Sequence, residues 1–219
     1  MKKNKKITFY SLILILWLIP NSSFAVSFDL FTNSNNYQKN SEFYVDVVIE
    51  PEGQSVNGVD GELSISNAKV LRIEDGGSVV KNWINRPISI LKNGSENIAF
   101  SGIIPNGFIG YANSTNKEGL VFRVVLKPSA DGQVNLSLKK VLVTKNDGEG
   151  TSINVKDKSL TIAVSNTGKN EKYIPIDNER PEVNYDIITD QNLFNGKKTL
   201  VFSVIDSKSG FKNAYIKEG

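Results

Sequence analysis

Residues 56–80, VNGVDGELSISNAKVLRIEDGGSVV, decide the fold of this chain. From Val59 onward, apolar or small residues alternate with polar ones. A period of two is typical of a strand with one face on a core and the other in solvent. Asn67-Ala68 then predicts a turn, and the apolar residues from Val70 predict a second strand. The stretch therefore predicts two successive strands of a β-protein.

The same alternation recurs through residues 26–164, where turn residues separate short runs. Pro87 cannot donate to a strand ladder, so its strand is expected at a sheet edge. Asn93-Gly94 predicts a tight hairpin turn. The alternation of apolar and polar residues shifts by one position at Lys139-Lys140, and a β-bulge would explain that shift. No helical period is present. The sequence predicts an all-β, nine-stranded sandwich or jelly roll. The nine strands are expected at residues 27–31, 42–50, 59–65, 70–73, 84–91, 97–103, 119–127, 134–143 and 160–164.

Residues 1–25 read as a secretory signal peptide. Four lysines precede an apolar run over residues 7–20, and the small residues Ser23 and Ala25 predict cleavage after Ala25. The run is shorter than the roughly 20 apolar residues of a spanning helix. The mature chain is therefore expected to be extracellular or at the cell surface, with no membrane span. It keeps 22 of the 26 basic residues against 23 acidic ones, so nucleic acid is not expected as a partner.

The chain has no Cys and no His. This composition excludes disulfides, thiol nucleophiles, Cys/His zinc sites and Ser-His-Asp triads. No spacing singles out a carboxylate pair. The acidic turn at residues 146–150, NDGEG, lacks the register of an EF-hand loop and predicts a plain turn. We therefore expect a non-catalytic protein without a metal or another cofactor.

Residues 165–180, SNTGKNEKYIPIDNER, are polar and charged and predict a linker. Residues 181–219 are again β-patterned, with a strand at 198–205 and another at 211–216. Fewer than 40 residues cannot bury a stable core alone. Either this segment packs onto the first domain, or the chain is a truncated piece of something longer. We expect the second, with residues 181–219 as a partial second β module.

Residues 26–164 resemble a cohesin domain, the bacterial β-sandwich that docks dockerin modules. The likeness rests on the order of five motifs: VNGVDGELSIS at 56–66, KVLRIEDGGSVV at 69–80, NIAFSGIIPNGFIG at 97–110, GLVFRVVLKP at 119–128 and SLTIAV at 159–164. Residues 181–219 are similar to the start of an immunoglobulin-like or fibronectin-like repeat, through the motif DSKSGF at 206–211. The resemblance implies a secreted interaction module that binds a dockerin-like protein module in assemblies linked to polysaccharide breakdown.

In cohesins the contact surface is a sheet face that includes the strand carrying Val59. The resemblance therefore implies seven partner-binding candidates: Asp60, Glu62, Ser64, Trp83, Asn85, Asn97 and Ser101. Trp83, the only Trp after cleavage, could equally cap the core. A first alternative is direct carbohydrate binding through the rings of Trp83, Phe108 and Tyr111. A second alternative is a structural spacer in a surface stalk, with no ligand.

Overall fold

The computed structural model describes residues 26–110, 119–174, 177, 179–189, 194–206 and 215–217. These residues form β-strands and connections, with one short 3₁₀ turn, η1 (Phe194–Gly196). The expected signal peptide, residues 1–25, lies outside the described residues, and so does Tyr111.

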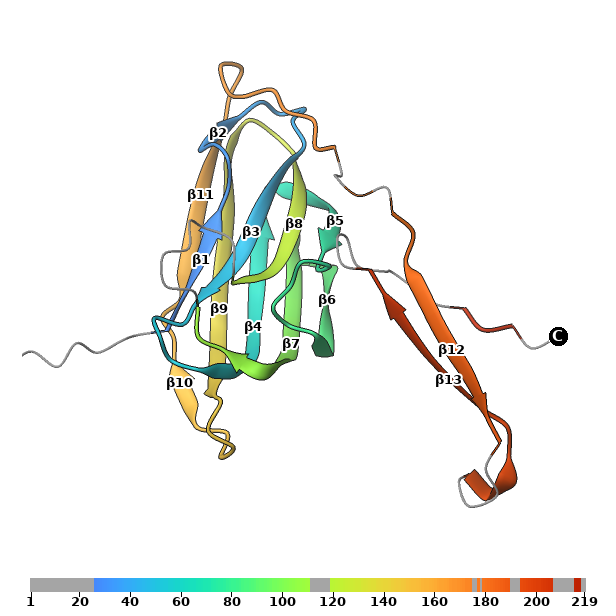
Figure 1. Ribbon diagram of the computed structural model, residues 1–219. Coiled ribbons are helices and arrows are strands. Elements are labelled where there is room, and N and C mark those ends of the chain that lie inside the picture. The colour runs from blue at the N-terminus through green and yellow to red at the C-terminus, as the bar shows by residue number, and fades with distance from the viewer. Residues whose placement is uncertain are drawn as a thin grey trace, which may run out of the picture.

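Two sheets face each other across the core (Figure 1). The four-stranded sheet has the order β1-β3-β8-β5, built from β1 (Ser27–Phe31), β3 (Phe43–Glu50), β8 (Leu120–Pro128) and β5 (Ala68–Glu74). All of its pairs are antiparallel. Apolar residues of β3 alternate with residues that face outward, as the sequence predicts for a half-buried strand.

The seven-stranded sheet has the order β2-β11-β9-β4-β7-β6, with β10 paired to β9. Its strands are β2 (Asn36–Tyr37), β11 (Lys158–Val164), β9 (Gly132–Lys145), β4 (Val56–Ser66), β7 (Ser95–Phe108), β6 (Asn82–Lys92) and β10 (Ser152–Asn154). β4 therefore lies in the middle of the sheet, and β6 is an edge strand, as Pro87 predicts.

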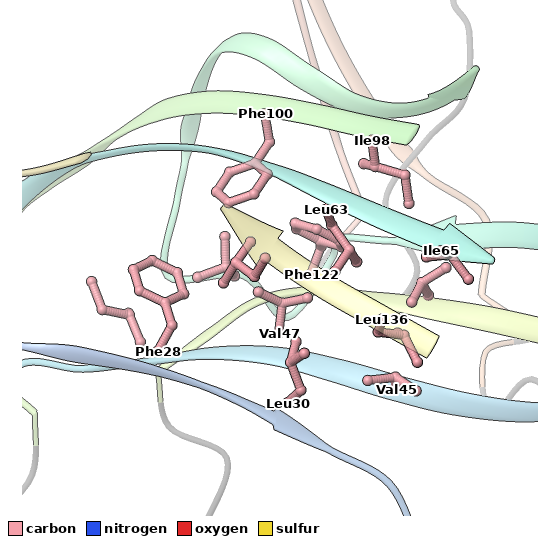
Figure 2. Close-up of a cluster of buried hydrophobic side chains, with 14 of the residues drawn as sticks. Phe28, Leu30, Val45, Val47, Leu63, Ile65, Ile98, Phe100, Phe122 and Leu136 are labelled. Carbon is pink, nitrogen blue, oxygen red and sulfur yellow. The ribbon is translucent and has the colours of Figure 1, made fainter. Parts of the chain in front are cut away.

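The inward side chains of both sheets form one hydrophobic core (Figure 2). Phe100 of β7 meets Phe122 of β8 edge to face, with ring centroids 5.1 Å apart. Gly61 is inward-facing on β4, and a Cβ there would meet the Phe100 ring. The alternation in β4 therefore sets one face on this core and leaves the other face outside.

All nine predicted strands are present, and the structure adds the two short strands β2 and β10. Asn93 and Gly94 both have positive φ, 52° and 76°, as the tight hairpin turn between β6 and β7 requires. The predicted bulge is confirmed, because the register of β4 on β9 shifts between Asp60 and Glu62. Lys140, at that shift, has a φ of 53°.

The first half of the predicted linker is fixed against the sandwich. Residues 165–173, called the strap below, hydrogen-bond to β2 and to the connection between β2 and β3. Figure 1 shows this segment crossing the end of the sandwich after β11. Since Tyr173 contacts side chains of β3, β5 and β8, the sandwich extends beyond residue 164.

The second β-patterned segment contains an antiparallel hairpin of β12 (Glu182–Ile188) and β13 (Thr199–Ile205). The hairpin forms a sheet of its own. Its apolar residues, among them Tyr185 and Ile187, are exposed in the described part of the chain. Most of the second strand that the sequence predicts in this segment, residues 211–216, lies outside the described residues. Two strands alone do not identify an immunoglobulin-like repeat.

Candidate docking face

The outer face of the strands β9-β4-β7-β6, called the docking face below, is built from rows of paired residues. Ser64 of β4 lies between Asn97 of β7 and Ser137 of β9. Residues directly opposite in an antiparallel pair point to the same side of the sheet. Ile90 of β6 extends this row, because it pairs with Asn97.

Asp60 belongs to a second row on the same face. Its partners are Ser101 of β7 and Leu142 of β9, and Ser101 also pairs with Asn85 of β6. The side chains of Asp60, Ser64, Asn85 and Ser101 make no hydrogen bond or ion pair with other described residues. Free hydroxyl, amide and carboxylate groups of this kind are available to a partner.

Glu62, between these rows, is paired with a lysine. Its Oε2 accepts from Lys140 Nζ at 2.8 Å. This hydrogen bond lowers the pKa of Glu62 and raises the pKa of Lys140. The bulge at Lys140 thus places a cation beside the carboxylate, so the docking face carries an ion pair at its centre.

Exposed isoleucines flank the polar rows on the side of β6. Ile88 and Ile90 are 65% and 66% exposed, and Ile103 of β7 is 43% exposed. Ile88 lies opposite Ala99, so these side chains share the face of Asn97 and Ser101. The docking face therefore combines apolar contact area with polar groups, as protein interfaces do.

Six of the seven predicted partner-binding residues lie on this face: Asp60, Glu62, Ser64, Asn85, Asn97 and Ser101. Trp83 does not join them. It pairs with Gly102, whose missing side chain leaves room for the indole, and it packs against the core. The register shift between Trp83 and Asn85 turns the two side chains to opposite sides of the sheet.

Three rings were proposed for carbohydrate binding, and the structure describes two of them, Trp83 and Phe108. These two rings do not form an exposed stacking surface. Phe108, like Trp83, is partly buried and packs against the core. Tyr111 lies outside the described residues. A sugar-stacking surface needs exposed rings, and the two rings that the structure describes are directed to the core side.

Sequence reasoning missed the exposed isoleucines Ile88, Ile90 and Ile103. The signal that could have found them is the hairpin turn at Asn93-Gly94, which fixes the register of β6 on β7. Within that register, Ile90 must share the face of Asn97.

Within the described ranges, no three or more His, Cys, Asp or Glu residues are grouped so as to hold a metal ion. Over the same part of the chain, no helix is long and apolar enough to cross a membrane.

Comparison with known proteins found no matching family model and no matching curated protein. Among solved structures, the chain is similar to the cohesin module of a family 33 glycoside hydrolase from Clostridium perfringens ATCC13124. The two are 14% identical, the match covers 69% of this chain and 100% of the module, and the TM-score is 0.47. The chain is also similar to a non-cellulosomal cohesin from the hyperthermophilic archaeon Archaeoglobus fulgidus, with 18% identity, 64% and 91% coverage and a TM-score of 0.44.

A third similar structure is the seventh ScaB type I cohesin from Pseudobacteroides cellulosolvens. It is 17% identical, the match covers 71% of this chain and 98% of that one, and the TM-score is 0.46. All three structures are cohesin modules, the family that the sequence resembles. The fold itself, an all-β sandwich of two sheets, is given by the strand pairing described above.

Proposed function

We propose that this chain is a secreted, non-catalytic docking module that binds a dockerin-like protein module through the docking face. The observation that supports this most strongly is the strand register, which gathers free polar side chains and exposed isoleucines on one side of β9-β4-β7-β6. The setting we propose is an extracellular or cell-surface assembly linked to polysaccharide breakdown, as the sequence resemblance implies. Residues 1–25 would direct the chain there.

The composition of the docking face suits contact with a folded protein. Aliphatic side chains at Ile88 and Ile90 can be buried by a partner, and each buried aliphatic side chain contributes roughly 1.5–3 kcal/mol in transfer free energy. The hydroxyl and amide groups of Ser64, Ser101 and Asn85 can then fix the orientation of the partner.

The partner is expected to lie on the face rather than to add a strand at the edge. β6, which carries Ile88 and Ile90, is an edge strand of its sheet. Its register on β7 shifts twice, once between Trp83 and Asn85 and once between Asn85 and Ile88. Pro87 lies inside the second shift. A bulged edge with a proline is a poor template for another strand.

Binding of the mature chain, residues 26–219, to a panel of recombinant dockerin modules tests the proposal. Calorimetric titrations with and without calcium would identify a dockerin that binds. The variant Ile90→Asp should weaken that binding by about tenfold or more, because a carboxylate would be buried without a partner. Ile174→Asp is the matched control, since Ile174 is 74% exposed and lies outside the docking face.

Three results would contradict the proposal. Equal weakening by both aspartate variants would mean that the docking face is not the contact. Retention on insoluble polysaccharide that is lost in Trp83→Ala would favour carbohydrate binding. A chain that binds no dockerin and no polysaccharide would favour a structural spacer.

A further inference from the structure

The strap, residues 165–173, has a paired backbone. The Lys169 N–H donates to the carbonyl of Asn36 at 3.0 Å, and the Gln38 N–H donates to the carbonyl of Lys169 at 2.9 Å. Tyr37 and Lys169 form a parallel bridge. Backbone groups paired in this way are protected from water, unlike those of a free linker.

A buried serine holds the next part of the strap. Ser41 Oγ donates to the carbonyl of Lys169 at 2.7 Å and accepts from the N–H of Glu171 at 3.1 Å. The carbonyl of Glu171 accepts from the N–H of Glu42 at 2.7 Å. Ser41 is fully buried, so its hydroxyl has no water as an alternative partner.

Tyr173 then ends the strap on a cluster of charged and aromatic side chains. Its hydroxyl donates to Glu74 Oε2 at 2.7 Å and accepts from Arg123 Nη1 at 3.2 Å. Its ring lies edge to face with Tyr44, with centroids 5.8 Å apart, and the guanidinium of Arg72 lies 5.0 Å from its centroid. Four side chains from three strands thus position one tyrosine.

Tyr173 adjoins a buried ion pair. Arg123 donates to Asp46 through two bonds, Nε to Oδ1 at 2.6 Å and Nη2 to Oδ2 at 2.8 Å, and the Asp46 side chain is 1% exposed. Burial alone would lower the pKa of Arg123, but the hydrogen bonds to Asp46 and Tyr173 raise that pKa overall. A buried, fully hydrogen-bonded pair of this kind gives Tyr173 a rigid anchor.

The anchor lies on the side of the sandwich away from the docking face. Asp46 of β3 pairs with Arg123 of β8, which pairs with Glu74 of β5. These three residues form an outward row of the four-stranded sheet, whereas the docking face is the outer side of the other sheet.

We propose that the strap is an exit lock: Tyr173 fixes the point where the chain leaves the sandwich on the outer side of the four-stranded sheet. The downstream segment then starts on the opposite side from a partner on the docking face. The connection to β12 therefore begins after Tyr173, rather than at residue 165. The exit lock does not depend on which protein binds the docking face.

Hydrogen exchange of the mature chain tests the lock directly. In the unmodified protein, the amides of Lys169, Glu171 and Glu42 should be protected. Tyr173→Ala should speed their exchange by about tenfold or more while leaving the amides of β8 and β9 unchanged. Ile174→Ala, a change at the next residue, should alter none of them. Tyr173→Phe should give an intermediate rate, since it keeps the ring and loses the hydroxyl.

Three results would overturn the lock. Exchange at free-chain rates in the unmodified strap would show that it is not fixed. Unchanged exchange in Tyr173→Ala would show that Tyr173 does not hold it. An equal rise at every amide would show that Tyr173 supports only the global stability of the sandwich.

The position of the exit can be measured in the same chain. Because the sequence has no Cys, the double variant Ser129→Cys and Ile174→Cys has cysteines at these two positions alone. Spin labels can therefore be attached specifically at both positions. We expect a narrow distance distribution that broadens when Tyr173→Ala is added. A distribution that is already broad, or one that Tyr173→Ala leaves narrow, would contradict the lock.

Discussion

The two outer faces of the sandwich differ in how their polar side chains are satisfied. On the four-stranded sheet, Asp46 is paired with Arg123, and Tyr173 of the strap donates to Glu74 beside them. On the seven-stranded sheet, Asp60 and Ser64 make no such contact with other described residues. The outer face of the four-stranded sheet, whose polar groups are paired within the chain, is called the closed face below. The docking face, whose polar groups are available to a partner, is called the open face.

This difference means that charge alone does not distinguish the proposed binding surface from the rest of the sandwich. The Asp46–Arg123 ion pair of the four-stranded sheet is more buried than the Glu62–Lys140 ion pair of the docking face, and its hydrogen bonds are made within the chain. The docking face is distinguished by exposed isoleucines beside hydroxyl and amide groups. Substitutions on the closed face should therefore change stability, and substitutions on the open face should change binding.

The sharpest contrast is between two aspartates. Asp46→Ala would leave the buried Arg123 guanidinium without its carboxylate, and we expect a loss of about 3–5 kcal/mol in the free energy of unfolding. Asp60→Ala, on the open face, should change it by about 0.5 kcal/mol or less. Urea denaturation of both variants measures the difference. Equal losses would break the distinction between the two faces.

A second contrast uses two glycines. An added Cβ at Gly168, in the strap, would meet the backbone of Tyr37, whereas one at Gly77 would make an ordinary contact with Leu120. Gly168→Ala should therefore cost about 1–3 kcal/mol and expose the strap to trypsin at Lys169 and Lys172. Gly77→Ala should be close to neutral. A strap that stays resistant to trypsin in Gly168→Ala would argue against its tight fit.

The strap should also weaken at alkaline pH. Burial and the hydrogen bond to Glu74 raise the pKa of Tyr173 above its ordinary value near 10, while Arg123 opposes the shift. A group whose pKa is raised on folding contributes stability that is complete below its unfolded pKa and is lost as the pH rises through the folded value.

The difference in stability between the unmodified chain and Tyr173→Phe should therefore shrink above about pH 10, by up to about 1 kcal/mol. Tyr37 is buried and its pKa is also raised, but it is common to both proteins and cancels in the difference. Thermal unfolding at pH 8 to 11 measures this quantity. A difference that does not change with pH would contradict the proposed role of the hydroxyl.

The smallest effect on stability is expected on the open face. Ile88→Ser and Ile90→Ser remove side chains that are about two-thirds exposed, so each should change the free energy of unfolding by about 0.5 kcal/mol or less. Their thermal midpoints should match that of the unmodified chain. A loss of several degrees would mean that these isoleucines belong to the structure of the sandwich rather than to a binding surface.

Much of the fold was predictable from the alternation of residues. The pattern around Val59 correctly separates the inward residues of β4 from Asp60, Glu62 and Ser64, because side chains in a strand alternate strictly. Lys139-Lys140 likewise predicts the bulge that the register shows.

Two features could not be predicted in this way. Trp83 and Asn85 are two positions apart, so strict alternation would put both side chains on the same face of the sheet. The bulge between them instead turns Trp83 to the core. The strap reads as a polar linker, because its partners Asn36 and Ser41 lie more than 120 residues earlier in the chain. Contacts of that separation depend on tertiary structure rather than on a local pattern.

The most direct test of the docking face is an NMR titration with isoleucine methyl groups labelled. On addition of a dockerin module that binds, the methyl signals of Ile88, Ile90 and Ile103 should shift, while those of the buried Ile49 and Ile162 should stay in place. A bound dockerin that leaves the signals of all three exposed isoleucines unchanged would contradict the account.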